Sequence, residues 1–109
     1  MNTVGNYTDA LANIDTLRSA NADGECVANV ISRVDDYCFE YGIPVRLDWM
    51  DHGDDYIVED EHLDHVLGGL TLILEGNAQG GLSSDGEYEF TLLPGYELDI
   101  HGAYIVADA

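Results

Sequence analysis

The sequence contains no lysine, and its three arginines stand against 22 acidic residues, which gives a net charge of −19 over 109 residues. After Arg46 the chain has no further basic residue of either type. Proteins bind nucleic acids and anionic lipids through clustered lysine and arginine side chains. The scarcity of these residues excludes direct binding to a nucleic acid or to an acidic membrane surface. A partner that is selected by charge must itself be basic.

Long hydrophobic runs are also absent. The apolar stretch LTLIL at residues 70–74 has the length of a strand, whereas a membrane-spanning helix needs about 20 residues. The first residues lack the basic segment and apolar stretch of a secretory signal. We therefore expect a cytoplasmic protein without a membrane partner.

Cysteine is scarce as well. Cys26 and Cys38 fall on one predicted helix, twelve positions apart, which separates them by about 18 Å along its axis. A disulfide requires Cα atoms within roughly 7 Å. The two cysteines therefore cannot pair with each other, and we predict that both are small core residues. Unpaired thiols fit a reducing cytoplasm.

The charge does not imply disorder, because 46% of the residues are hydrophobic. Disordered acidic chains combine high charge with low hydrophobicity, and only the first condition is met here. No internal repeat, linker or low-complexity segment divides the chain. Residues 1–109 are therefore predicted to fold as a single domain.

The hydrophobic pattern predicts two helices in the N-terminal half. In residues 7–20, Tyr7, Leu11, Ile14 and Leu17 recur at helical spacing, with Asn6 as the N-cap. Residues 25–41 carry the clearest signal, and Gly42 and Pro44 end this second helix. Its apolar stripe consists of Cys26, Val27, Val30, Ile31, Val34, Tyr37, Cys38 and Tyr41. Its opposite side consists of Glu25, Asn29, Ser32, Asp36 and Glu40.

From residue 45 the period changes to two, which predicts strands at 45–49 and 70–74. A short strand at 56–58 and one helical turn within 59–67 lie between them. Segments 87–93 and 96–106 flank Pro94-Gly95, which predicts a hairpin. The predicted fold is α+β, with two N-terminal helices packed on one face of an antiparallel β-sheet, a meander. The other face is expected to present Glu75, Glu87, Glu89, Glu97 and Asp99 to solvent.

One stretch, MDHGDDYIVEDEHLDH at residues 50–65, concentrates the acidic residues. It contains seven carboxylates and three histidines, and no lysine or arginine. Carboxylates at this density repel one another, so we expect that they serve a function and not folding.

Catalysis and metal binding are the first functions to test. The sequence has no G-x-S-x-G, P-loop or H-E-x-x-H motif, so we expect neither an enzyme nor a cofactor. The acidic block does not fit the EF-hand pattern. Divalent-metal binding stays open as an alternative, because the block mixes ligand types that suit zinc or manganese. The candidate ligands are Asp51, His52, Asp54, Asp55, His62 and His65.

The net charge matches that of a short piece of DNA. A globule of this length has a radius of gyration of about 13 Å and a diameter of roughly 34 Å. Duplex DNA of that length displays about 20 phosphate charges, against −19 for the protein. A rigid surface of this charge density can compete with DNA for a basic cleft.

In these properties, and in the clusters VDDY, DHGDDY and EDEHLDH, the chain resembles phage-encoded acidic DNA mimics of the anti-CRISPR and anti-restriction class. The resemblance implies an inhibitor that blocks a basic nucleic-acid-binding protein or a Cas surveillance complex of the host cell. It also implies the contact residues, which would stand in for phosphates. These are Asp35, Asp36, Glu40, Asp51, Asp54, Asp55, Glu59, Asp60, Glu61 and Asp64.

Salt adaptation is the main alternative. Proteins of extreme halophiles are also acidic, avoid lysine and favour Asp over Glu, which here number 14 and 8. The chain would then be a small binding or structural domain with a hydrated acidic surface. The dense block at residues 51–64 and the seven tyrosines, which suit an interface, favour the inhibitor hypothesis.

Overall fold

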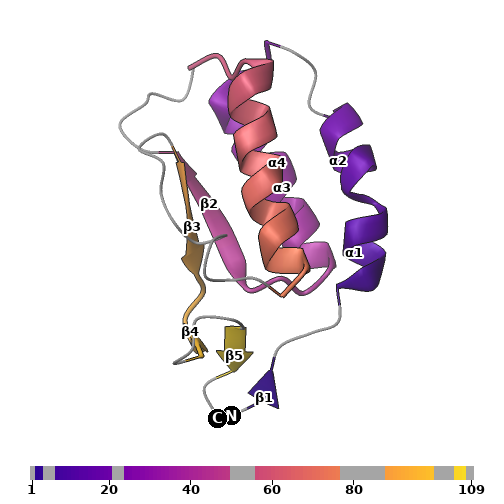
Figure 1. Ribbon diagram of the computed structural model, residues 1–109. Helices are drawn as coiled ribbons and strands as arrows, with labels where there is room; N and C mark the ends of the chain where they lie inside the picture. Colours follow the sequence, from indigo (N-terminus) through magenta and orange to yellow (C-terminus); the bar gives the residue numbers. More distant parts are fainter. Residues whose placement is uncertain are drawn as a thin grey trace.

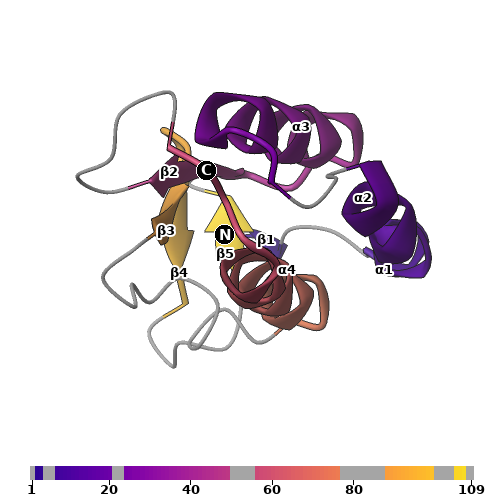
Figure 2. The same ribbon diagram turned by 90° about the horizontal axis from the view of Figure 1, so that it is seen from above.

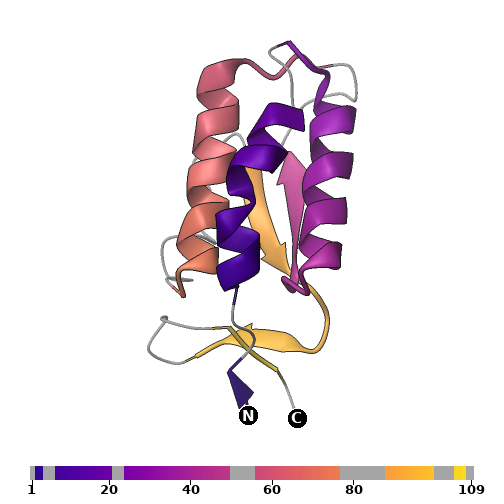
Figure 3. The same cartoon turned by 90° about the vertical axis from the view of Figure 1, so that its right-hand side faces the viewer.

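The computed structural model describes residues 2–3, 7–20, 24–49, 56–76, 88–99 and 105–107. Within these segments the chain is α+β (Figure 1). Helices α3 and α4 begin at the same end of the molecule and run in the same direction. Helices α1 and α2 pack across them on one side, and strands β2 and β3 lie on the other (Figures 2 and 3). None of the described helices is long and apolar enough to cross a membrane.

The first predicted helix is divided in two. Helix α1 spans Thr8–Ala12 and helix α2 spans Ile14–Ala20, with Asn13 between them. The Asn13 side-chain amide donates a hydrogen bond to the Asp9 carbonyl oxygen at 2.8 Å. Asparagine side chains compete with the backbone in this way and interrupt helices. The observed N-cap is Tyr7, and the predicted cap Asn6 lies outside the described residues.

The second predicted helix is confirmed. Helix α3 spans Val27–Glu40, and Cys26 is its N-cap. Gly42 adopts a positive φ of 67° just after the helix, which explains the glycine at this position. The predicted stripe faces the core, with the buried residues Val27, Val30, Val34, Tyr37 and Cys38.

The predicted strand at 70–74 was wrong, because helix α4 spans Asp60–Leu74 without interruption, and the helical turn predicted within 59–67 is only its beginning. The alternation of Leu70, Leu72 and Leu74 with Thr71 and Ile73 imitates the pattern of a strand. The true pattern is helical, with the buried residues Leu63, Val66, Leu67, Leu70, Ile73 and Leu74. Glu75 is consequently the C-cap of α4 and does not lie on a sheet.

The predicted meander was also wrong, because the described strands form two separate sheets. Strand β2 (Val45–Trp49) pairs antiparallel with β3 (Tyr88–Leu92). Strand β5 (Ile105–Ala107) pairs with β1 (Asn2–Thr3) on one side and with β4 (Tyr96–Leu98) on the other. Within the described segments, the predicted strand at 56–58 forms one isolated bridge, between Cys26 and Ile57.

A turn does form at Pro94-Gly95, but it does not make a hairpin. The Tyr96 N–H donates to the Leu93 carbonyl oxygen at 3.3 Å, and Gly95 has a φ of 90°. Proline followed by a glycine of positive φ is the pattern of a type II turn. The strands before and after this turn belong to different sheets, so the chain passes from one sheet to the other here.

The core joins the helices to the β2–β3 pair. Trp49 is 9% exposed and belongs to this core, as the alternation at 45–49 predicted. The Tyr37 hydroxyl donates to the Ala10 carbonyl oxygen and so links α3 to α1. Of the residues expected on the solvent-facing side of the sheet, Glu97 is exposed, Glu89 and Asp99 are half-buried, and Glu87 lies outside the described residues.

Candidate functional site

Each arginine of the chain is paired with a carboxylate of the same chain. Arg18 on α2 pairs with Asp64 on α4. Arg33 Nη1 lies 3.2 Å from Glu25 Oε1, and Arg46 Nε lies 3.3 Å from Asp48 Oδ2. With no lysine in the sequence, these three pairs leave a large excess of carboxylates.

Most of the described acids point to solvent. Ten of them are exposed, and they occur on all four helices, at helix ends and on strand β4: Asp9, Asp15, Asp36, Glu40, Glu59, Asp60, Glu61, Asp64, Glu75 and Glu97. An outward surface of this composition attracts cations and basic proteins at long range.

The beginning of α4 holds four of the predicted contact residues. Glu59 is the N-cap, and Asp60 and Glu61 lie in the first turn. Acids at this position interact favourably with the helix dipole, by about 0.3–1 kcal/mol each. Asp64 lies one turn further on, in the ion pair with Arg18. Asp60 and Glu61 therefore lie where a helix favours acids and Asp64 joins α4 to α2, while the expectation that the acidic block serves a function stays a prediction.

The beginnings of α3 and α4 are tied together. The Val27 N–H donates to the Tyr56 carbonyl oxygen at 2.6 Å, and the Val58 N–H donates to the Glu25 carbonyl oxygen at 2.8 Å. The Glu25 carboxylate accepts a hydrogen bond from Asn29 and pairs with Arg33, and both interactions lower its pKa. We call Glu25, Glu59, Asp60 and Glu61 the helix-start cluster.

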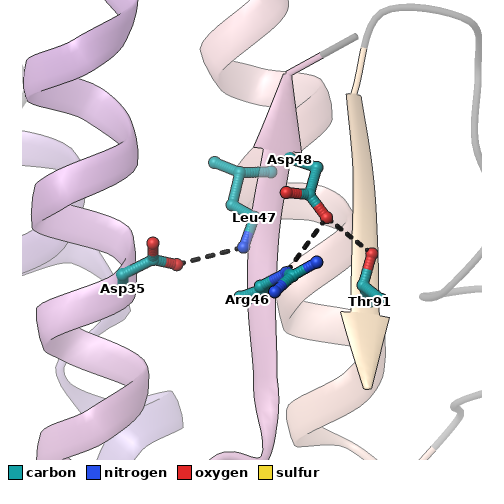
Figure 4. A network of polar contacts seen from close by, with 5 residues as sticks. All are labelled: Asp35, Arg46, Leu47, Asp48 and Thr91. Carbon is teal, nitrogen blue, oxygen red and sulfur yellow. Dashed lines mark hydrogen bonds and ion pairs between the residues drawn. The ribbon is translucent and has the colours of Figure 1, made fainter. Parts of the chain in front are cut away.

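Asp35 differs from the other predicted contact residues. It is half-buried and points from α3 toward strand β2, where it accepts a hydrogen bond from the Leu47 N–H at 3.0 Å (Figure 4). Burial raises the pKa of this carboxyl, and the nearby charges of Asp48 and Asp36 add to the effect. Asp35 therefore holds the edge of β2 and has a structural role.

Those predicted contact residues that the structure describes do not all lie together. Asp36 and Glu40 lie in the C-terminal half of α3, and the helix-start cluster lies at the opposite end of this helix. Asp36 lies nine residues after Val27, the first residue of α3, which corresponds to about 14 Å along the helix axis. The remaining predicted residues, Asp51, Asp54 and Asp55, lie outside the described part of the chain.

Sequence reasoning missed Phe39, whose side chain is 90% exposed. It lies on α3 between Asp36 and Glu40, and we call these three residues the α3 ridge. A signal was present, because Phe39 falls outside the apolar stripe of the helix and next to its polar face. A large apolar residue at such a position is not needed for the core.

A groove flanks the α3 ridge on each side. The first has a volume of about 380 Å³, lies between α2 and α3, and contains Arg33, Asp36, Tyr37, Glu40 and Tyr41 in its lining. The second has a volume of about 330 Å³ and lies between α3 and β2. Its lining consists of Asp35, Asp36, Phe39, Ile43, Val45, Arg46 and Leu93. Asp36 is thus shared by both grooves.

The candidate metal ligands are only partly described. His62 is half-buried beside the rings of Trp49 and Tyr56, and its Nδ1 lies 3.4 Å from the Tyr56 hydroxyl. His65 is exposed on the same helix. Among the described residues, no group of three or more His, Cys, Asp or Glu side chains could hold a metal ion. The other four candidates lie outside the described segments.

Comparison with protein-family models, curated proteins and solved structures finds no match to this chain. The chemistry of the surface has to be judged from its own residues.

Burial raises the pKa of the Cys38 thiol to about 12, so this thiol stays protonated and unreactive near neutral pH. What the described surface offers is exposed carboxylates, one exposed phenylalanine and two open grooves, and these features suit the binding of a protein.

Proposed function

We propose that the protein is a non-enzymatic inhibitor that occupies the basic nucleic-acid-binding site of a host defence complex, most simply as an anti-CRISPR DNA mimic. The observation that carries this proposal is the charge pairing. All three arginines are paired within the chain, and ten described acids remain exposed. A basic protein can supply cations to the nine of these acids other than Asp64, which already pairs with Arg18.

The dimensions support the proposal. The chain has a radius of gyration of 13.4 Å and extents of 40 × 28 × 19 Å. A duplex as long as the largest extent carries about 24 phosphate charges, against a net charge of −19 for the protein. These dimensions and this charge per unit length are similar to those of a short duplex, which supports competition for a DNA-binding cleft.

The chemistry of binding follows from the exposed carboxylates. Arginine and lysine side chains of a nucleic-acid site form charge-assisted hydrogen bonds with carboxylate oxygens as they do with phosphates. Association is then fast and weakens with salt, because it depends on long-range attraction. Inhibition is by occupancy and needs no cofactor.

A halophile-adapted binding or structural domain is the second candidate. The observation in its favour is the spread of exposed acids over every described helix, for example Asp9 on α1, Asp15 on α2 and Asp64 on α4. A surface that only needs hydration has no reason to concentrate its charge in one place. This candidate predicts dependence of folding on molar salt and no competition with DNA.

The first test is retention of proteins from a bacterial lysate on the immobilised protein, at low salt and at about 0.5 M salt. We expect a CRISPR or restriction subunit to be retained at low salt and to be released by added duplex DNA. Retained proteins that duplex DNA does not release, or the absence of any retained protein, would contradict the proposal.

Two charge-reversal variants locate the surface. In the first, Asp54, Asp55, Asp60 and Glu61 are changed to lysine, and in the matched control Asp9, Asp15, Glu75 and Glu97 are changed. Both variants move the net charge from −19 to −11, and both place two lysines in first helical turns. We expect the first variant to lose retention and the control to keep most of it. If the first variant folds and still retains and fully inhibits the partner, the DNA-mimic hypothesis is wrong.

A further inference from the structure

The acids of the α3 ridge are placed where helix stability does not favour them. Glu40 is the last residue of α3, Asp36 lies one turn earlier, and no basic residue occupies the last turn. The C-terminal end of a helix is the negative end of its dipole, where acids are unfavourable and cations are favourable. The acids at the start of α4 have the opposite, favourable placement. The α3 ridge therefore has an unmet preference for a cation.

The groove between α2 and α3 has the shape and chemistry for that cation. Asp36 and Glu40 lie in its lining together with the rings of Tyr37 and Tyr41, whose centroids are 4.8 Å apart. A guanidinium group binds carboxylates in a planar fork and stacks on aromatic rings, which an ammonium group does less well. Arg33 also lines the groove, but Glu25 pairs with it at 3.2 Å and offsets its charge.

The second groove offers an apolar contact next to this one. Phe39 is 90% exposed, and Leu93 across the groove is 36% exposed. The groove also contains Ile43 and Val45, which are 2% and 3% exposed. Covering a phenylalanine side chain removes apolar surface from water and stabilises a complex. Single exposed apolar residues are common, but here Phe39 lines one groove and neighbours Asp36 and Glu40, which line the other and form no ion pair with the described arginines.

We propose that the α3 ridge docks one arginine-bearing segment of a basic protein partner, with the arginine in the α2–α3 groove and an apolar residue of the same segment against Phe39 and Leu93. A second copy of this chain is a poor occupant, because two ridges would bring Asp36 and Glu40 against the same residues of another molecule with a net charge of −19. The inference rests on the proposed function in one respect, that the partner is basic. It adds where the partner binds and which side chain it presents.

The test uses three short peptides and the full-length protein. The first peptide carries arginines spaced among leucines, the second has lysine at each arginine position, and the third has serine at each leucine position. Binding is followed by the backbone amide signals in nuclear magnetic resonance spectra. We expect the first peptide to shift signals of residues 36–42 and of Leu93, and to bind about threefold or more tightly than the lysine peptide.

Two variants assign the two contacts. Phe39→Ser is expected to weaken binding of the first peptide about tenfold and to leave the affinity for the serine peptide unchanged. Asp36→Asn combined with Glu40→Gln is expected to abolish the preference for arginine over lysine. Leu72→Ser, which alters an exposed apolar residue of α4, is the control and should leave all three affinities unchanged.

The outcomes separate this inference from the proposed function. Peptide-induced shifts spread over the helix-start cluster as much as over the α3 ridge, or an unchanged affinity in Phe39→Ser, would overturn the docking proposal. The proposed function would still stand if the lysate experiment retained a partner that duplex DNA displaces. Specific peptide binding at the ridge without any DNA-displaced partner would support the docking site and count against DNA mimicry.

Discussion

At the scale of single residues, Asp35 shows how the charge of this chain affects its stability. Its carboxylate accepts the Leu47 N–H at the edge of β2, but burial and the charges of Asp48 and Asp36 raise its pKa above the ordinary value of 3.8. As pH rises, the unfolded chain loses this proton before the folded protein does. The contribution of Asp35 to stability therefore falls as pH rises from about 4 through the raised pKa, and it stays lower at neutral pH.

Substitutions at Asp35 separate the charge from the hydrogen bond. Asp35→Asn keeps an oxygen acceptor for Leu47 and removes the charge, so we expect an unchanged or higher free energy of unfolding at pH 7. Asp35→Ala leaves the Leu47 N–H without its acceptor and should lower that free energy by about 1–3 kcal/mol. Urea unfolding at pH 4 and pH 7 measures the free energy of unfolding of both variants. An equal loss in the two variants at pH 7 would show that β2 needs the charged form.

At the scale of elements, helix α4 contains a matched pair of glycines. A Cβ added at Gly68 would have no neighbour within 4 Å, whereas a Cβ at Gly69 would lie 3.1 Å from the Tyr88 hydroxyl oxygen and 3.4 Å from Phe90 Cε2. The Tyr88 hydroxyl donates to the His65 carbonyl oxygen, which restrains it from moving. The second glycine is thus required for close packing of α4 on β3, and the first is not.

Alanine at these two positions should have opposite effects. Gly68→Ala is expected to raise the free energy of unfolding by about 0.5–1 kcal/mol, because alanine favours the helix and restricts the unfolded chain. Gly69→Ala gains the same helix propensity but crowds Tyr88, so we expect no gain or a net loss. Thermal and urea unfolding of the two variants give the comparison. Equal stabilisation by both would mean that Tyr88 and Phe90 shift without cost.

The same elements show what the sequence could and could not predict. The stripe of α3 and the alternation of β2 are strong local patterns, and both were predicted correctly. The continuation of helix α4 to Leu74 was not predicted, because exposed Leu72 imitates an alternating strand and the glycine pair imitates a break. The Pro94-Gly95 turn was found, but local sequence does not show that β3 pairs with β2, about forty residues earlier. Phe39 was missed because helical periodicity identifies the apolar stripe that faces the core, and Phe39 lies outside this stripe.

At the scale of the whole molecule, self-repulsion among carboxylates opposes folding. The largest extent of the chain is 40 Å, and the Debye length falls from about 30 Å at 0.01 M salt to about 10 Å at 0.1 M. At the lower salt concentration most acids of the surface repel one another, and at the higher one only near neighbours do. Electrostatic destabilisation should therefore be relieved largely between these two concentrations.

We therefore expect the melting temperature to rise by several degrees between about 0.01 M and 0.2 M sodium chloride and then to change little. The control reversal variant, with a net charge of −11 in place of −19, should show a smaller rise, because repulsion scales with charge. Calorimetry or circular dichroism at each salt concentration gives both curves. A halophile-adapted domain behaves differently, since it gains stability from salt far beyond the range in which screening is complete. A native state that forms only near molar salt would assign the carboxylates to hydration of the surface, whereas a plateau below 0.2 M leaves them free to bind a basic partner under ordinary ionic conditions.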